Sequence, residues 1–514
     1  MKTETAFSLA NIAREHAQAR PDAIALVCDD RHLTWSDLQR RSAAVGAALS
    51  QAGVQAGDRV GLLMKNTPEF HEATFACNMI GAAVVGLNWR LAVGELSAII
   101  DNAQPTLLIV DAEHAQLVPT PANRPAAMRV IVLGEEYEQW LGQASGAAPD
   151  VPAAPDNVAL VLYSSGTTGL PKGIMITNQN LSYTRHMATE LFRMHQDSVH
   201  LVASPLFHIG GAGTGLTLMT IGGRTVLMRE ASAPQILDTI ARERVTHAFF
   251  VPAVIQQLVE LQELENHDLS SLELLAYGAA PMSEALLRRA IDVLGCGFLG
   301  CYGMTETAGT VTALFPEEHS SQGPRTHLLQ SVGKPLSWAT LRVMDNETGQ
   351  ELPAGQVGEI WVSSDANMKG YLKQADITAE TLVDGGWLRT GDGAYRDEEG
   401  YFFLQDRIKD MIISGGENVY PMEVENVLAD HAGVAEVAVI GVPHEKWGET
   451  VKAVVVARPG VDVDSSELIE FSRSRLAHYK CPTSVDYLAE LPRTATGKVL
   501  KKSLRALYTD TSAP

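Results

Sequence analysis

The feature that most constrains this chain is a short apolar run that ends in a loop of small and hydroxyl-bearing residues. Residues 158–163 predict a buried strand, and the segment 164–173 that follows reads SSGTTGLPKG. Glycines allow backbone N–H groups to approach an anion closely, hydroxyls add donors, and Lys172 adds a compact positive charge. This combination suits a polyphosphate, although a surface turn rich in Gly, Ser and Thr has a similar composition. The loop alone leaves both interpretations open.

The spacing of this loop differs from that of the Walker A motif, in which the lysine is followed by Ser or Thr and opens a helix. Here Gly173 follows Lys172, and the apolar run 174–176 predicts another strand. A P-loop NTPase is therefore the poorer interpretation of the segment.

Length and composition indicate a globular protein of more than one unit. A chain of 514 residues exceeds one ordinary domain and predicts two or three packed units. Hydrophobic residues make up 46% and charged residues 20%, which is enough apolar sequence for a sizeable core. The formal net charge of −21 argues against a nucleic-acid partner, which needs a basic face.

Cysteine usage and the absence of long apolar runs point to a reducing compartment. The five cysteines, at 28, 77, 296, 301 and 481, show neither a disulfide pattern nor metal-ligand spacing. The first residues, MKTETAFSLANIAREH, lack the apolar segment of a signal peptide, and no run reaches the ~18 apolar residues of a membrane helix. We expect a cytoplasmic protein without a transmembrane segment.

Secondary-structure patterns alternate along the chain. Strand-like and helix-like segments follow one another through residues 1–155, which favours α/β layers. Short alternating strands from about residue 357 predict a β-rich subdomain. The helix-like and strand-like segments between residues 423 and 476 indicate that the C-terminal part of the chain is a compact α+β unit of about 100 residues.

A second motif, YGMTET at residues 302–307, carries groups that suit a nucleotide. Tyr302 can stack on a base, Thr305 can donate to a phosphate, and Glu306 can hold Mg²⁺, which prefers oxygen ligands. In isolation the same residues are equally typical of a polar loop at the end of a strand.

Taken with later segments, SSGTTGLPKG resembles the signature loop of the adenylate-forming superfamily, which contains acyl-CoA synthetases, luciferases and nonribosomal-peptide adenylation domains. The resemblance extends over nearly the whole chain, through PLFHIGG at 205–211, YGMTET, RTGD at 389–392, ISGGENVYP at 413–421 and the C-terminal TATGK at 494–498. ISGGENVYP is the form typical of acyl-CoA synthetases. One position of the signature loop differs from the usual pattern: Ser164 stands where Thr is usual, which keeps the hydroxyl.

The resemblance implies a large N-terminal α/β domain, with two layered sheets and a β-rich subdomain, and a small C-terminal α+β domain. The implied boundaries are 1–407 for the adenylation domain, with the ATP and acyl sites, and 408–514 for a mobile domain that turns about Lys409. Lys498 would be the catalytic lysine, with Thr305, Glu306 and His208 as further catalytic residues.

The resemblance also implies the binding residues. The ATP site would comprise Ser164, Ser165, Gly166, Thr167, Thr168, Gly169, Lys172, Gly278, Ala279, Ala280, Tyr302, Gly303, Thr305, Asp392, Arg407 and Lys498. The acyl site would comprise His208, Gly210, Gly211, Ala276, Tyr277, Gly278 and Met304. Coenzyme A would meet Ser414, Gly415, Gly416 and Lys480, and Mg²⁺ would be held by Thr168 and Glu306.

The implied activity is that of an ATP-dependent acid–thiol ligase, which forms an acyl-adenylate and then an acyl-CoA thioester with release of AMP and pyrophosphate. A medium- or long-chain fatty acid is the first choice of substrate, from the GGENVYP-type C-terminal half and the glycine-rich PLFHIGG region. An aryl, alicyclic or steroid-derived acid and the loading of a carrier protein are the alternatives. A homodimer is possible.

Overall fold

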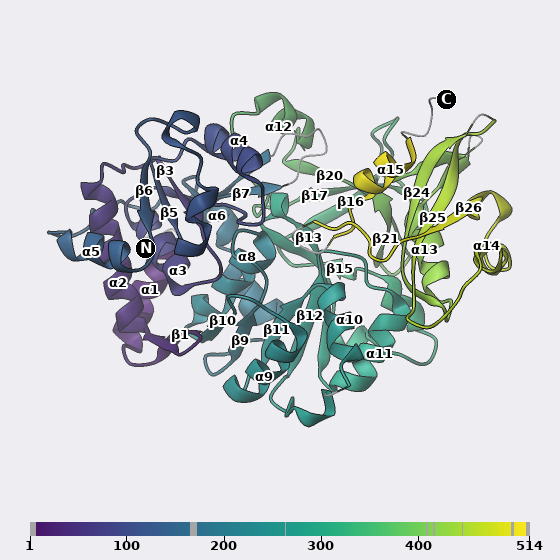
Figure 1. The fold of residues 1–514 in the computed structure, drawn as a ribbon, viewed down its shortest axis with the longest axis horizontal. Helices are drawn as coiled ribbons and strands as arrows, with labels where there is room; N and C mark the ends of the chain where they lie inside the picture. The colour runs from purple at the N-terminus through teal and green to yellow at the C-terminus, as the bar shows by residue number, and fades with distance from the viewer. Residues whose placement is uncertain are drawn as a thin grey trace.

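The computed structural model describes residues 7–164, 172–262, 264–407, 410–414, 417–444, 446–494 and 498–509. These residues form four sheets, and Figure 1 shows two parts: a large lobe that contains three of the sheets and a small lobe at the C-terminal end. The predicted α/β and α+β architecture, with a large N-terminal and a small C-terminal unit, is confirmed. The exact boundary at 407/408 stays a prediction.

The largest sheet, the nine-stranded sheet, is mostly parallel. Its strand order is β15-β14-β13-β12-β11-β9-β10-β1-β2. At one edge β2 is antiparallel to β1, and at the other β14 is antiparallel to both β13 and β15. The bounds are β1 Ile24–Cys28, β2 Arg31–Thr34, β9 Val199–Val202, β10 Arg224–Leu227, β11 His247–Phe250, β12 Leu274–Gly278, β13 Gly297–Met304, β14 Gly309–Leu314 and β15 Lys334–Pro335.

The second large sheet, the seven-stranded sheet, contains the predicted strand of the glycine-rich loop. Its order is β18-β8-β7-β4-β3-β5-β6, in which β7, β4, β3, β5 and β6 are parallel and β8 and β18 close the edge in antiparallel fashion. The bounds are β3 Arg59–Leu63, β4 Ala83–Gly86, β5 Leu107–Val110, β6 Arg129–Val132, β7 Val158–Ser164, β8 Lys172–Thr177 and β18 Gly370–Tyr371.

The two remaining sheets belong to the β-rich subdomain and the small lobe. The subdomain sheet consists of β16 Thr340–Met344, β17 Gly358–Ser363, β19 Leu382–Val383, β20 Trp387–Arg396 and β21 Phe402–Arg407. The small-lobe sheet consists of β22 Ile412–Ser414, β23 Glu417–Val419, β24 Val434–His444, β25 Gly448–Ala457 and β26 Ser484–Tyr487. The small lobe has apolar cores of its own, one of which includes Val424, Val439 and Val455.

The helices lie between and around the sheets. Their bounds are α1 Leu9–Ala19, α2 Trp35–Gln51, α3 Pro68–Met79, α4 Val93–Ala103, α5 Glu135–Gln143, α6 Asn178–Leu181, α7 Thr184–His186, α8 Ile209–Thr217, α9 Ala233–Glu243, α10 Pro252–Glu260, α11 Glu284–Leu294, α12 Ala375–Thr381, α13 Pro421–Ala429, α14 Ser465–Arg473 and α15 Lys501–Thr509. No helix of the described part of the chain is long and apolar enough to cross a membrane.

Local sequence explains where several of these helices begin and how they pack. Thr34 caps α2: its hydroxyl accepts a hydrogen bond from the Asp37 N–H, and the Asp37 carboxylate accepts one from the Thr34 N–H. Every residue of α3 is buried, as expected for a helix that is enclosed by neighbouring layers. By contrast α9 and α11 bury one apolar face each against the nine-stranded sheet, in a core that includes Leu237 and Leu287.

Candidate active site

The end of β13 meets the subdomain sheet through a direct side-chain contact. The Tyr302 hydroxyl donates to Asp392 Oδ2 at 2.9 Å, although the two residues are 90 positions apart. Asp392 lies on β20 and pairs in register with Arg407 on β21. The structure therefore brings together three residues that the sequence assigned to the nucleotide. The Asp392 carboxylate suits a sugar diol, because its oxygens only accept hydrogen bonds.

A second contact joins the short helix Thr305–Thr307 to the edge of the seven-stranded sheet. The Tyr371 hydroxyl donates to Glu306 Oε1 at 2.9 Å, and the Lys172 ammonium lies 4.9 Å from the centroid of the Tyr371 ring. Glu306 is 8% exposed. A nearly buried carboxylate and an ammonium group that both contact Tyr371 suit a hard cation such as Mg²⁺ and the phosphates, and Glu306 fits the predicted role of oxygen ligand.

Sequence reasoning missed Tyr371. Its position follows from the pairing of β18 with β8, in which Tyr371 lies opposite Ile174, just after Lys172. The only available signal was the KGY triplet at 369–371, and nothing local to that triplet indicates that its tyrosine contacts Glu306, 65 positions away.

The loop between β7 and β8, residues 165–171, lies outside the described residues. Ser164 and Lys172 are paired in register at the ends of the two strands, so the two described ends of the SSGTTGLPKG segment face each other. The remaining predicted residues of this loop (Ser165, Gly166, Thr167, Thr168 and Gly169) lie outside the described residues, as do Lys409, Gly415 and Gly416.

His208 begins helix α8 as its N-cap. Its Nδ1 accepts from the Gly210 N–H at 3.1 Å, which leaves the proton of the neutral ring on Nε2. Burial lowers the pKa of His208 to about 4, so the ring is neutral at pH 7. A neutral imidazole with an Nε2–H donor can orient a carboxylate without contributing a charge.

The two glycines after His208 have different roles. A Cβ on Gly210 would lie 3.5 Å from the Phe249 ring, so Gly210 leaves space in front of that ring. A Cβ on Gly211 would overlap the Pro205 carbonyl oxygen at 2.1 Å. Gly211 is therefore required for the close packing of α8 on the preceding turn, and its predicted contact with an acyl group is not needed to explain it.

Strand alternation divides the predicted acyl residues of β12. Ala276 pairs with Phe249 on β11, and the two side chains pack in the same core beneath α8. Tyr277 projects from the opposite face, where its hydroxyl makes a 2.9 Å hydrogen bond with His319. Because successive residues of a strand point to opposite faces, Tyr277 does not share the pocket side with Ala276. We leave Tyr277 out of the proposed pocket and add Phe249, which sequence reasoning missed.

The end of β12 holds a strained turn. A Cβ on Gly278 would lie 2.3 Å from the Cys301 carbonyl oxygen, and Ala279 has a φ of 65°. A left-handed φ is costly for alanine and persists only where the surroundings require it. Ala280 follows this turn, and Gly303 and the partly buried Met304 end β13, just beyond Cys301, which pairs with Gly278.

In the small lobe, the predicted catalytic and coenzyme residues lie near the surface. Lys498 is exposed, and its backbone N–H donates to the Thr494 hydroxyl at 3.1 Å. Lys480 contacts both carboxylate oxygens of Glu423, at 2.7 and 2.8 Å. Ser414 ends β22 and pairs with Gly448 on β25. Lys480 is thus held by an ion pair inside its own lobe.

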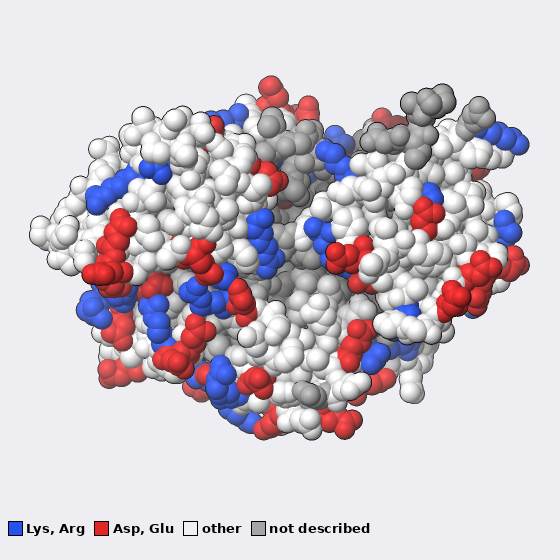
Figure 2. All heavy atoms as spheres, viewed as in Figure 1, with Lys and Arg blue, Asp and Glu red and all other residues white. Residues whose placement is uncertain are grey.

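A groove separates the two lobes. Figure 2 shows it as a hollow between the large lobe and the small lobe, with Lys and Arg side chains on both walls. These local positive groups offset the net charge of −21 where an anionic nucleotide would approach.

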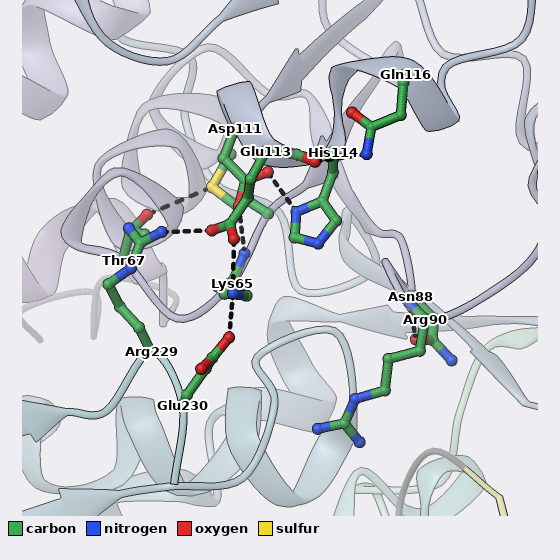
Figure 3. Close-up of polar contacts among 11 residues, drawn as sticks. Lys65, Thr67, Asn88, Arg90, Asp111, Glu113, His114, Gln116, Arg229 and Glu230 are labelled. Carbon is green, nitrogen blue, oxygen red and sulfur yellow. Dashed lines mark hydrogen bonds and ion pairs between the residues drawn. The ribbon is translucent and has the colours of Figure 1, made fainter.

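A separate charged cluster lies on the large lobe and is internally satisfied. Asp111, Glu113 and His114 bring their possible metal-ligand atoms within 4.8 Å of one another. Figure 3 shows, however, that Glu113 is bound by Lys65 at 2.7 Å and by Arg229 at 2.6 Å, and that Asp111 is bound by His114. Two cations on one carboxylate disfavour a metal ion, so we assign this cluster to the packing of the two sheets.

The comparisons with known proteins identify the family of this chain. The model of the AMP-binding enzyme family matches residues 13–372, and that of the AMP-binding enzyme C-terminal domain matches residues 423–498. The chain therefore belongs to the AMP-binding enzymes, the adenylate-forming superfamily, in its acyl-CoA synthetase branch. The resemblance identified from the sequence is confirmed.

Individual relatives cover nearly the full chain. A fatty acid–acyl-carrier-protein ligase, ScoC of Streptomyces coeruleorubidus, is 39% identical and covers 97% of this chain and 96% of its own. A feruloyl-CoA synthase of an Amycolatopsis species is 40% identical, with 96% and 97% covered. The crystal structure of ATP-bound MatB from Rhodopseudomonas palustris superimposes with a TM-score of 0.90 at 30% identity, with 98% and 100% covered.

Proposed function

We propose that the protein activates an organic carboxylic acid with ATP and transfers the acyl group to coenzyme A. In the first half-reaction a carboxylate oxygen attacks the α-phosphorus of ATP, and the bond to pyrophosphate breaks. In the second, the thiol sulfur attacks the acyl carbon, the bond to AMP breaks, and the thiol proton is released. AMP is the leaving group that a free carboxylate lacks.

The observation that carries this proposal is the convergence of two contacts at the ends of β13 and β18. The Tyr302–Asp392 pair offers a carboxylate to the ribose hydroxyls, and the Glu306–Tyr371–Lys172 group offers an acid and an ammonium to the phosphates. A site with these two ends suits a nucleoside triphosphate, and we assign His208 and Phe249 to the part of the site that presents the acid.

The first step joins two anions, so the residues act mainly by positioning and by neutralising charge. We assign Thr305 and the loop from Ser164 to Lys172 to the phosphates, and Arg407 to the ribose or phosphate. Mg²⁺, when bound, would neutralise phosphate charge, with Glu306 and Thr168 as its assigned ligands. Lys498 would bridge the acid carboxylate and the α-phosphate.

The second step requires that Lys498 leave. We assign to the small lobe a rotation about Lys409 that withdraws Lys498 and presents the segment 414–416 to the pantetheine arm. Lys480, now paired with Glu423, would exchange that partner for a phosphate of the coenzyme.

The acid is assigned by class. A medium- or long-chain fatty acid is the first candidate, and an aryl or alicyclic acid is the second. The names of the relatives support both, since ScoC is named for fatty acids and the Amycolatopsis enzyme for a feruloyl group. The small residues at Gly210 and Ala276 beside the Phe249 ring support an apolar acyl group of either kind.

A pyrophosphate-release screen tests the proposal. The purified protein, with ATP and Mg²⁺, is offered straight-chain, aromatic and cyclic acids, and products are measured with free coenzyme A or with a phosphopantetheinyl carrier protein. We expect AMP and an acyl-CoA thioester with at least one class. Thioester only on the carrier protein would support the alternative acceptor, and absence of pyrophosphate release with every acid would refute the proposal.

A further inference from the structure

The turn that carries Asp392 is an insertion in an antiparallel pair of strands. Glu359 of β17 lies opposite Gly393 of β20. Two residues further along β17, Trp361 lies opposite Arg389. The single residue between Glu359 and Trp361 therefore faces three residues of β20, so β20 contains two more residues than β17 at this point. A bulge of this kind re-aims side chains away from the regular alternation of a strand, and Asp392 is the last residue of the bulge.

The backbone of this bulge has a hydrogen-bond acceptor in the buried Glu359 side chain. Glu359 is 3% exposed, and its Oε1 accepts a hydrogen bond from the Gly391 N–H at 2.9 Å. Gly391 directly precedes Asp392 and has a left-handed φ of 71°, and a Cβ at Gly391 would meet nothing within 4 Å. Glycine is therefore favoured here by the backbone conformation and not by lack of space. Glu359 holds the residue whose conformation sets the direction of Asp392.

The second oxygen of Glu359 is bound by side chains of both strands. Its Oε2 accepts from Arg389 Nε at 3.1 Å, from Arg389 Nη2 at 2.9 Å and from Trp361 Nε1 at 3.3 Å. The guanidinium supplies the positive charge without which a buried carboxylate would be very costly. Because Arg389 precedes the bulge and Gly391 lies within it, one carboxylate ties the bulge to β17 at two points.

Thr390, between these two points, binds the next backbone N–H. Its hydroxyl donates to the Ile360 carbonyl of β17 at 2.8 Å and accepts from the Asp392 N–H at 3.1 Å. The N–H groups of Gly391 and Asp392 are thus both held by side chains, which replace the partners that a regular strand would supply. On the side of β17, the position of Asp392 therefore depends on these contacts rather than on regular strand pairing.

Only an ionised carboxylate can accept on both sides of this site. Both oxygens of a carboxylate accept hydrogen bonds, whereas an amide has one accepting oxygen and one donating NH2 group. In Glu359→Gln, the NH2 group would face either the Gly391 N–H or the Arg389 guanidinium, donor against donor. The substitution keeps the size of the side chain and breaks one of its two attachments.

We propose that Glu359 is a positioning residue for ATP, which holds Gly391 and thereby aims the Asp392 carboxylate at the ribose hydroxyls without touching the nucleotide. The proposal rests on the assignment of Asp392 to the ribose in the proposed function. A role confined to the stability of the subdomain is the competing explanation. The two differ in one measurable property, the preference for a nucleotide that carries both ribose hydroxyls.

ATP analogues that lack one hydroxyl measure this preference. The kcat/KM for pyrophosphate release is compared for ATP, 2′-deoxy-ATP and 3′-deoxy-ATP, with an acid that the wild type activates. We expect the wild type to prefer ATP over at least one analogue by roughly tenfold or more, since a hydrogen bond to a carboxylate is charge-assisted. Glu359→Gln should raise the KM for ATP and reduce the preference to within roughly threefold, because Asp392 is no longer held in place.

Two further comparisons separate positioning from stability. Glu72→Gln is the matched control, because Glu72 is also a buried carboxylate of the large lobe, 0% exposed and bound by Arg41 at 2.6 Å and by the Tyr137 hydroxyl at 3.2 Å. It should leave the ribose preference unchanged. In an Asp392→Ala background, which should lack the preference, Glu359→Gln should change kcat/KM for ATP by less than roughly twofold, because its effect passes through Asp392.

Gly391→Ala reaches the same turn without disturbing the buried charge, and it decides the case if Glu359→Gln does not fold. A left-handed φ is costly for alanine, so the turn should shift away from its present conformation. We expect the preference to fall in the same direction as in Glu359→Gln. Circular dichroism and thermal melting establish that each variant compared is folded.

The outcomes distinguish this role from the function on which it rests. If Asp392→Ala loses the preference while a folded Glu359→Gln, or Gly391→Ala in its place, retains it, the positioning role alone is overturned. If the wild type shows no preference, or Asp392→Ala retains it, the assignment of Asp392 to the ribose is overturned and the positioning role with it. Absence of pyrophosphate release with every acid would refute the acid activation itself.

Discussion

The two lobes hold their functional residues in opposite ways. In the large lobe, Asp392 and Glu306 are each bound by a tyrosine hydroxyl at 2.9 Å, and His208 is fixed as the N-cap of α8. In the small lobe, Lys498 is exposed, and Lys480 is paired with a glutamate of its own lobe. Buried, hydrogen-bonded acceptors in one lobe and an exposed lysine in the other suit the proposed reaction, in which Lys498 is needed for only one of two steps.

The largest effect expected from this comparison is the loss of Lys498. Lys498→Ala should lower the rate of adenylate formation by about 10²–10³, as for the loss of one key electrostatic group. Transfer from a pre-made acyl-adenylate to coenzyme A should be spared. Single-turnover assays of each half-reaction measure both, and Lys502→Ala, an exposed lysine of α15, is the control. Equal losses in both half-reactions would show that the lysine assignment is wrong.

The next prediction concerns the proposed hinge at Lys409. Lys409→Pro should leave adenylate formation within about threefold and slow thioester formation at least tenfold, because proline fixes φ where the lobe must turn. Lys409 lies outside the described residues, so this prediction comes from the family resemblance alone. Unchanged rates of both half-reactions would place the hinge elsewhere.

A smaller effect is expected from loss of the Tyr371 hydroxyl, which donates to the Glu306 carboxylate. Tyr371→Phe removes one hydrogen bond to Glu306 and should raise the KM for Mg²⁺–ATP by about tenfold, with a smaller change in kcat. Tyr401→Phe, which removes a similar tyrosine–glutamate contact with Glu318 outside the proposed site, is the matched control. An unchanged KM for Tyr371→Phe would remove Tyr371 from the site.

Local motifs predicted part of this site, and tertiary pairing supplied the rest. The segments around Lys172 and Glu306 are recognisable because each places several suitable groups within a few residues. The Tyr371 and Asp392 contacts span 65 and 90 positions, so no local pattern contains them. They depend on which strand lies beside which, and that is set by packing over the whole lobe.

Tyr277 and Gly211 show the other limit of sequence reasoning. The run Ala276-Tyr277-Gly278 was predicted as one wall of the acyl pocket, but a strand sends neighbouring side chains to opposite faces, and Tyr277 faces His319. Likewise Gly211 is small because α8 contacts the Pro205 carbonyl, and a sequence cannot separate that reason from space for a substrate. The alternation of strands and helices predicted the α/β layers correctly, and the family resemblance supplied the division into a large and a small lobe.

The smallest effect expected near neutral pH concerns the buried histidines of the large lobe. Burial lowers the pKa of His71 and His208 to about 4, of His200 to about 3 and of His247 to about 4. In the unfolded chain each would bind a proton near pH 6.5. Between pH 6.5 and about 4 the unfolded state therefore binds more protons, so stability is complete above pH 6.5 and falls as the pH is lowered through this window.

His71 allows this prediction to be tested at a residue with no assigned role in the site. Each such histidine contributes up to about 1.4 kcal/mol per pH unit to the slope of unfolding free energy. His71→Met should therefore flatten the slope between pH 6.5 and 5 in urea denaturation, whereas His32→Met, at an exposed position, should not. A slope that is the same in both variants would mean that the large lobe does not hold His71 neutral, and the contrast between its enclosed groups and the exposed cation of the small lobe would be weaker than the structure indicates.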